Sequence, residues 1–204
     1  MLDRLANRHL EVPLRHLAKR MIGLGARADH VTLVGFCLGM LALPALASEH
    51  YGLALLFIVL NRVADGLDGA IARLTGPSAA GGFLDITLDF FFYASIPLGF
   101  ILADPSHNAL AGSLLMFSFV GTGTSFLATA IFAERHGIQD MSAGKKAFHY
   151  SNGLMEGTET QIFFVAMCLL PAYFPGLALT FATLCMATSV LRVYATFRTL
   201  KASS

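Results

Sequence analysis

Residues 51–103 read YGLALLFIVLNRVADGLDGAIARLTGPSAAGGFLDITLDFFFYASIPLGFILA, two apolar runs joined by a turn at Thr75-Gly76-Pro77-Ser78. Each run has roughly the 20 residues that an α-helix needs to cross the hydrocarbon core of a bilayer. Four aspartates nevertheless lie within this stretch. An ionised carboxylate near the bilayer core costs about 2.5 to 3.5 kcal/mol on insertion scales. Some functional interaction of the aspartates must therefore offset this insertion cost.

The spacing of the aspartates indicates what that function is. Asp65 and Asp68 are three residues apart and Asp85 and Asp89 are four apart, so each pair shares one face of a helix. Two helices joined by a short turn would direct the four carboxylates toward a common point. Ligands made only of oxygen favour Mg²⁺, Mn²⁺ or Ca²⁺ over Zn²⁺, and paired cations suit the transfer of phosphoryl groups. The stretch therefore predicts a site for hard divalent cations.

The composition of the whole chain agrees with a membrane location. Of its 204 residues, 55% are hydrophobic and 13% are charged, and the mean hydropathy is +0.65. These values exclude an ordinary soluble domain and predict an integral membrane protein. The net charge of +1 says little about partners, and no nucleic-acid partner is expected. Cys37, Cys168 and Cys185 lie in apolar runs without paired spacing, so neither a disulfide framework nor a thiolate metal site is predicted.

The predicted fold class is all-α, with six transmembrane helices. The expected spans cover residues 30–48, 51–74, 82–103, 108–132, 157–174 and 177–198. The connections after the first, third and fifth spans contain no Lys or Arg, and all fourteen basic residues lie elsewhere: in the N-terminal segment, at span ends, in the 133–153 loop or at Lys201. By the positive-inside rule, both termini and the four aspartates are expected on the cytoplasmic side of a cell inner membrane.

The N-terminal segment, residues 1–28, is expected to lie outside the membrane-spanning part. Leucines and a methionine alternate there with basic side chains, and Pro13 interrupts the pattern. We expect a basic amphipathic helix lying in the cytoplasmic interface, with a disordered basic tail as the alternative. No stretch of signal-peptide type is evident, so this start is expected to be retained. Residues 29–204 are expected to form one six-helix membrane domain.

A longer pattern around the aspartates resembles a known signature. The pattern consists of Asp65, Asp68, Gly69, Ala72, Arg73, Gly81, Asp85 and Asp89. It closely resembles the signature of the CDP-alcohol phosphotransferase family of membrane enzymes that synthesise phospholipids. One departure exists, because seven residues separate Arg73 from Gly81 where eight is the commoner spacing. Gly82 restores eight but leaves only two residues before Asp85, so the sequence leaves open which glycine permits close approach of the nucleotide.

The resemblance implies a reaction and a set of roles. A hydroxyl of an alcohol acceptor attacks the β-phosphorus of a CDP-linked donor, expected to be CDP-diacylglycerol, and CMP leaves. Two Mg²⁺ or Mn²⁺ ions would be held by Asp65, Asp68, Asp85 and Asp89. Asp89 would be a ligand or the base that deprotonates the acceptor. The nucleotide pocket would be lined by Asp65, Asp68, Gly69, Ala72, Arg73 and Gly81. The family also implies a homodimer. Taken without the resemblance, the glycines and the alanine could equally serve helix packing in the membrane.

Residues at the cytoplasmic start of the fifth span are candidates for binding the acceptor alcohol. They are Lys145, Lys146, His149, Glu156 and Glu159, with Arg192 of the sixth span added for its reach toward phosphate. The lysines could bind an acceptor phosphate or anchor the chain to anionic lipid, and the glutamates could bind an ammonium headgroup or pair with nearby cations. The histidine could be an auxiliary acid or base or an ordinary interfacial histidine. Family members that make phosphatidylglycerophosphate commonly have a Lys directly after the last aspartate, and none follows Asp89, so the resemblance implies a serine or amino-alcohol acceptor in preference to that product.

Two other functions stay open on the sequence. The carboxylates could carry protons or cations in a small membrane transporter, although ion pathways usually place acids near the midplane of the bilayer. Alternatively, the chain could be a catalytically silent binding subunit that keeps the pattern only for structure.

Overall fold

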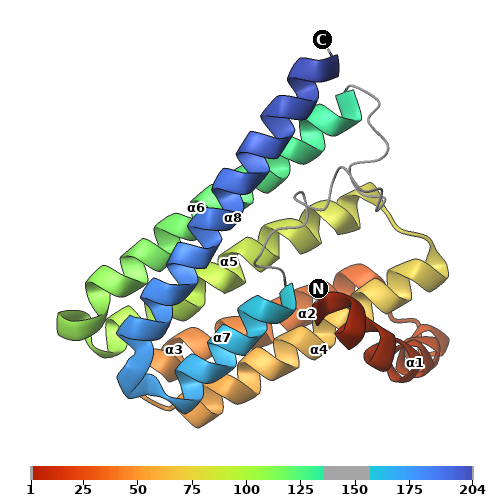
Figure 1. Ribbon diagram of the computed structural model, residues 1–204. Helices are drawn as coiled ribbons and strands as arrows, with labels where there is room; N and C mark the ends of the chain where they lie inside the picture. The colour runs from red at the N-terminus through yellow and green to blue at the C-terminus, as the bar shows by residue number, and fades with distance from the viewer. Residues whose placement is uncertain (1, 136–156, 204) are drawn as a thin grey trace.

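The computed structural model describes residues 2–135 and 157–203, and within these ranges the chain forms helices joined by short turns (Figure 1). The elements are α1 (Leu2–Gly23), α2 (Ala28–Met40), α3 (Ala42–Ala47), α4 (Tyr51–Thr75), α5 (Ala79–Ala103), α6 (Pro105–Arg135), α7 (Gly157–Leu169), the 3₁₀ turn η2 (Pro171–Tyr173) and α8 (Phe174–Ser203). Helices α6 and α8 lie side by side as a long pair, while α4 contacts α1, α2 and α7 (Figure 1). The all-α prediction is confirmed.

Four helical stretches in the described part of the chain are long and apolar enough to cross a membrane. They are Ala28–Ala47, Ala79–Ala103, Pro105–Arg135 and Pro171–Ala202. The spans predicted at 51–74 and 157–174 are not among them. Helix α4 carries Arg62, Asp65, Asp68 and Arg73, and the described α7 has only 13 residues. The protein is therefore an integral membrane protein, and the count of six spans stays a prediction.

Three boundaries differ from the predicted spans for identifiable reasons. The first span breaks between α2 and α3 because Pro44 has no N–H to donate to the carbonyl of Met40. Helix α5 begins three residues earlier than predicted because Ser78 caps it, its Oγ accepting a 2.9 Å hydrogen bond from the N–H of Gly81. Helix α7 ends before Pro171, since a residue that precedes proline disfavours the helical conformation.

Aromatic side chains fill the core between α5, α7 and α8. Phe92, Phe100, Phe164, Phe174 and Phe181 are fully buried. The rings of Phe100 and Phe174 stack with their centroids 4.4 Å apart, and Phe164 meets Phe92 edge to face at 6.4 Å. Stacked and edge-to-face arrangements of this kind stabilise a core beyond the area that the rings bury. This cluster fixes α5, and with it two of the signature aspartates.

Small residues bring α2 against α4. A Cβ atom added at Gly35 would lie 2.5 Å from the Cβ of Ala64, and one added at Gly39 would lie 2.8 Å from the Nδ2 of Asn61. Membrane helices usually pack through small residues that let their backbones approach closely. The hydrophobic effect does not drive helices together in lipid, so van der Waals packing matters more. Helix α4 is thereby held at a fixed rotation, with Asp65 and Asp68 facing α5.

The N-terminal segment forms the predicted helix, α1, and Pro13 does not interrupt it. One face of this helix packs onto α4. Ala18 is completely buried, and Leu14, Met21 and Ile22 pack beside it against Leu67, Ala70 and Ile71 of α4. The apolar face of α1 thus covers the side of α4 opposite the aspartates; that the helix lies in the membrane interface stays a prediction.

Candidate active site

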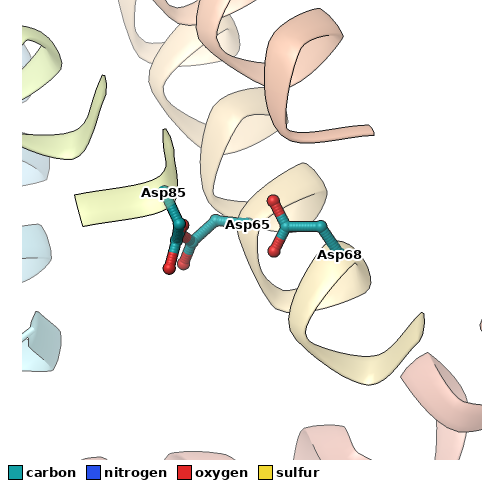
Figure 2. A group of neighbouring side chains, drawn as sticks. All are labelled: Asp65, Asp68 and Asp85. Carbon is teal, nitrogen blue, oxygen red and sulfur yellow. The ribbon is translucent and has the colours of Figure 1, made fainter. Parts of the chain in front are cut away.

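Three carboxylates from two helices converge at the start of α5. Asp65 and Asp68 lie one turn apart on α4, and Asp85 lies in the second turn of α5. One oxygen from each lies within 4.8 Å of the others, and Figure 2 shows the three groups turned toward one another. The turn between the helices requires Gly76, whose φ of 100° lies in the left-handed region that other residues rarely adopt. The folding of the predicted helical hairpin is what assembles this cluster.

The cluster fits a divalent cation of the Mg²⁺ or Mn²⁺ type. Such ions take oxygen ligands at about 2.1 Å, so two ligands of one ion lie at most about 4.2 Å apart. The three oxygens need only a small adjustment to meet that limit. Asp68 is buried while Asp65 and Asp85 are half-buried, so the group is shielded yet open to water. Bringing three acids this close without a cation would be costly, which favours bound metal.

Asp89, the fourth predicted ligand, is not one of these three clustered groups and pairs with Arg62 and Tyr93. Its Oδ1 forms an ion pair with the Nη2 of Arg62 at 2.7 Å, and its Oδ2 accepts a 3.3 Å hydrogen bond from the hydroxyl of Tyr93. It still lines the same small cavity as Asp65, Asp68 and Asp85. The structure therefore clusters three of the four predicted metal ligands and pairs the fourth with Arg62, which also lies 3.6 Å from Asp65.

Arg62 was missed as a site residue in the sequence, where it was counted only among the basic residues at span ends. Its guanidinium lies 4.8 Å from the ring centre of Phe92 and donates from Nη1 to the hydroxyl of Tyr93 at 3.1 Å. Its Nε donates to the Oδ1 of Asn61 at 2.8 Å. The sequence did contain a signal for Arg62, because it is an arginine within an apolar run, one turn before Asp65. A charged residue in such a run is a candidate functional residue by default.

Thr32 on α2 is a second residue that the sequence did not reveal. Its Oγ1 donates a 2.6 Å hydrogen bond to the Oδ2 of Asp68. Carboxylates that bind metals are typically oriented by such outer partners. Nothing in the spacing of α2 marks this threonine, because the partner lies 36 residues away.

A larger cavity of about 330 Å³ opens beside the carboxylates. Its walls include five of the residues predicted to bind nucleotide or metal: Asp68, Gly69, Ala72, Gly81 and Asp85. The N-terminus of α5 also faces it through Ser78 and Gly82. A helix N-terminus carries partial positive charge and favours phosphate. The cavity is thus suited to an anionic ligand next to a cation.

The two glycines at the start of α5 differ in their surroundings. A Cβ at Gly81 would lie 2.8 Å from the Oδ1 of Asp29 and 3.0 Å from the Oγ of Ser78, whereas a Cβ at Gly82 would meet nothing within 4 Å. The absence of a side chain is therefore required by packing at Gly81 and not at Gly82. Both glycines line the cavity, and the assignment of Gly81 to the signature stays a prediction.

Arg73 lies at the edge of the cavity and is not part of its wall. Its side chain is exposed, and a Cβ added at Gly69 would lie 3.2 Å from its Nη1. The guanidinium therefore lies across Gly69, one turn earlier on α4. From there its fork is close to the mouth of the cavity, where it could reach phosphate oxygens.

The predicted acceptor residues are only partly described. Lys145, Lys146, His149 and Glu156 lie outside the described residues. Glu159 is half-buried in the first turn of α7. Arg192 is buried and donates from Nη1 to the backbone carbonyl of Thr122 at 3.0 Å and to the Oγ of Ser125 at 3.2 Å. These contacts direct Arg192 to α6, and its role toward an acceptor stays a prediction.

Fold and site together define a helical membrane protein with a carboxylate cluster beside a cavity. The chain matches the family model of CDP-alcohol phosphatidyltransferase over residues 26–197 and belongs to that family. The resemblance drawn from the signature is confirmed. The matched region begins after α1.

Relatives and solved structures agree with this assignment. The chain is 51% identical to the inner membrane protein YnjF of Escherichia coli, over 98% of both chains. It is 33% identical to the archaetidylinositol phosphate synthase of Pyrococcus horikoshii, over 60% of this chain and 72% of that one. The fold is similar to that of the phosphatidylinositol phosphate synthase PgsA1 of Mycobacterium tuberculosis, with a TM-score of 0.67, 18% identity and coverage of 90% of this chain and 93% of that one in the structure with CDP-DAG bound. A second structure of that synthase contains manganese and citrate.

Proposed function

We propose that this chain transfers a phosphatidyl group from CDP-diacylglycerol to an alcohol acceptor and releases CMP. The observation that carries the proposal is the position of Asp68 and Asp85, which belong to the carboxylate cluster and also line the 330 Å³ cavity. A cation held at the cluster would touch whatever anion occupies the cavity. A cytidine diphosphate meets that requirement, and the family's name and the CDP-DAG bound to the mycobacterial synthase support it.

The metal site in this proposal consists of Asp65, Asp68 and Asp85. Two Mg²⁺ or Mn²⁺ ions, with Asp89 as a further ligand, are the expectation from the signature; manganese in the structure of the mycobacterial synthase supports the type of ion. Bound divalent cations would neutralise the diphosphate and make the acceptor hydroxyl easier to deprotonate. Thr32 keeps the carboxylate of Asp68 oriented toward the cluster.

The chain's own residues have distinct roles in the reaction. Gly69, Ala72 and Gly81 leave room for the CMP portion, and Arg73 at the cavity edge donates to phosphate oxygens. Asp89 accepts the proton of the acceptor hydroxyl while the oxygen of that hydroxyl forms a bond to the β-phosphorus. The bond from that phosphorus to the bridging oxygen breaks, and the electron pair leaves with CMP.

The location that fits this chemistry is an inner membrane with both termini and the site on the cytoplasmic side. The distribution of Lys and Arg in the sequence supports that orientation, and the Escherichia coli relative is an inner membrane protein. In this proposal residues 29–204 form the catalytic membrane domain, α1 covers α4 from outside, and the protein is a homodimer as its family implies.

A test of the proposed function measures CMP release by purified protein given CDP-diacylglycerol and Mn²⁺. The acceptors offered singly are serine, glycerol 3-phosphate, inositol, inositol phosphate and choline. Inositol phosphate is included because two of the relatives are archaetidylinositol phosphate synthases. Release that depends on one acceptor and on metal is expected. Cation flux across liposomes without any dependence on CDP-lipid would instead support a transporter, and tight CDP-lipid binding without turnover a silent subunit.

A further inference from the structure

Gln161, in the second turn of α7, has a buried amide that the site described above does not use. Its Oε1 and Nε2 atoms are both buried, and neither has a hydrogen-bond partner in the part of the chain that the structure describes. An amide has an acceptor and two donors, and burying them without partners costs folding free energy. Nearly all buried polar groups in native proteins have partners, so this amide points to a ligand that pairs with it.

The direction of Gln161 follows from its spacing to Phe164. The two residues are three apart on α7 and share one face of the helix. The ring of Phe164 is fully buried, and its centroid lies 6.0 Å from that of Tyr93 and 6.4 Å from that of Phe92. Those two rings flank the guanidinium of Arg62, 5.3 and 4.8 Å from its carbon Cζ. Gln161 therefore lies on the face of α7 that is turned toward the candidate active site.

The depth of Gln161 in the fold follows from the direction of the helices. Helices α5 and α7 run the same way through the core (Figure 1), and Phe164 of α7 meets Tyr93 of α5. One turn earlier on both helices, Gln161 is at the level of Asp89, whose Oδ2 accepts a 3.3 Å hydrogen bond from the hydroxyl of Tyr93. Side chains on a helix lean toward its N-terminus, so the amide extends away from the aromatic rings and toward the start of α5.

We propose that the amide of Gln161 binds the acceptor alcohol through hydroxyls other than the reacting one, which selects a polyol or a polyol phosphate. The inference rests on the proposed function, in which Asp89 takes the proton of the reacting hydroxyl. A hydroxyl both donates and accepts, so two neighbouring hydroxyls can pair with the Oε1 and Nε2 of one amide.

This acceptor differs from the serine or amino alcohol that the resemblance implies. The amide of Gln161 has no charge with which to offset the burial of an ammonium or a carboxylate group. Choline, in addition, has no N–H to donate to the Oε1 atom. Hydroxyls are the groups that pair with both atoms of the amide at the smallest cost in lost hydration.

Replacement of Gln161 by Met separates this role from a structural one. Methionine is unbranched and of similar length, but it has no N–H donor and only a weak acceptor. Without a ligand, Gln161→Met is expected to unfold at a temperature at least about 2 °C higher, because an apolar group replaces the buried amide. Affinity for the acceptor is expected to fall at least about tenfold, since a site built to bind a hydroxyl depends on that partner. A glutamine that only stabilises the fold would lower the unfolding temperature when replaced.

The experiment measures the unfolding temperature of purified protein with Mn²⁺ and CMP while myo-inositol 1-phosphate is added, and in a separate titration serine. A ligand that binds the folded state raises this temperature. The wild type is expected to respond to inositol phosphate at a concentration at least about tenfold lower than Gln161→Met, and neither protein should respond to serine. CMP release is the second readout: the KM for inositol phosphate should rise at least about tenfold, and the KM for CDP-diacylglycerol should stay within about twofold of the wild type.

Ile162→Met is the matched control, because Ile162 is 52% exposed on α7, and it should change neither readout. Should Gln161→Met not fold, Gln161→Asn provides the test. Asparagine keeps the amide but draws it back by one methylene group, so inositol phosphate should bind at least about threefold more weakly.

Three results would overturn the inference: equal affinity of the wild-type and Gln161→Met proteins for inositol phosphate, a lower unfolding temperature of Gln161→Met without ligand, or a wild-type protein that does not respond to inositol phosphate. The titration needs no CDP-diacylglycerol. Protein that binds inositol phosphate through Gln161 but releases no CMP would therefore contradict the proposed transfer alone.

Discussion

The Oγ1 of Thr32 on α2 lies 2.6 Å from the Oδ2 of Asp68 on α4 and donates a hydrogen bond to it. The same hydroxyl lies 3.1 Å from the carbonyl of Ala28, one turn earlier on α2. This contact joins the first apolar helix to the buried member of the carboxylate cluster. It leaves the other oxygen of Asp68 for a cation, so the orientation of this ligand depends on a helix outside the signature.

Replacement of Thr32 by Val should therefore weaken metal binding. Valine keeps the shape of the side chain but removes the donor, and loss of an outer partner typically costs 10- to 100-fold in metal affinity or activity. We expect Mn²⁺ to bind about tenfold more weakly in a calorimetric titration. Thr32→Ser retains the hydroxyl and should bind Mn²⁺ within about threefold of the wild type. Equal affinity in the Val and wild-type proteins would show that Thr32 does not orient Asp68.

Gly81 and Gly82 should respond differently to alanine. In Gly81→Ala the new methyl group meets the side chains of Asp29 and Ser78, so these side chains, including the Ser78 cap of α5, must shift. This shift would misplace the bound donor, and a misplacement of about 1 Å can cost about 100-fold in rate. We expect the KM for CDP-diacylglycerol to rise about tenfold. Gly82→Ala meets open space and should raise KM much less. A larger effect at Gly82 would assign the signature glycine to that position instead.

Gly35 should be essential for the packing of α2 on α4. Alanine there places its Cβ 2.5 Å from that of Ala64, and overpacking of this kind typically costs about 1 to 3 kcal/mol. The unfolding temperature in detergent should fall. Gly52→Ala is the matched control, since a Cβ there meets nothing within 4 Å and alanine favours the helix by up to about 1 kcal/mol.

A thiol-reactive dye can follow this unfolding, because Cys168 and Cys185 are buried and become reactive only when the fold opens. Cys37 is exposed and would first be replaced by serine. A Gly35→Ala protein as stable as the Gly52→Ala protein would contradict the close packing of α2 on α4.

The signature aspartates were predictable because helical spacing and a short turn leave few ways to arrange them. Asp65 and Asp68 had to share a face of α4, and the turn at Gly76 had to return the chain so that Asp85 faced them. The pairing of Asp89 with Arg62 could not be predicted in this way. Its partner Arg62 lies 27 residues earlier, and the rings of Phe92 and Tyr93 pack around the guanidinium.

The existence of the helices could be predicted from the length of the apolar runs, but the residues at which they begin and end could not. Pro44, Ser78 and Pro171 set three boundaries through missing donors and a cap, which are local effects that hydropathy does not register. The packing of α1 on α4 was also not predicted, because an amphipathic helix has the same sequence pattern whether its apolar face contacts lipid or protein.

The most decisive measurement compares CMP release by the wild-type and Asp85→Asn proteins with CDP-diacylglycerol, Mn²⁺ and the preferred acceptor. Asp85 belongs to the carboxylate cluster and to the cavity wall, and asparagine keeps its size while removing its charge. Asp104→Asn, in the exposed turn before α6, is the matched control and should release CMP at the wild-type rate. Release should fall to background in Asp85→Asn, with expression and unfolding temperature retained. Wild-type turnover in that variant would contradict a metal-dependent transfer at this site.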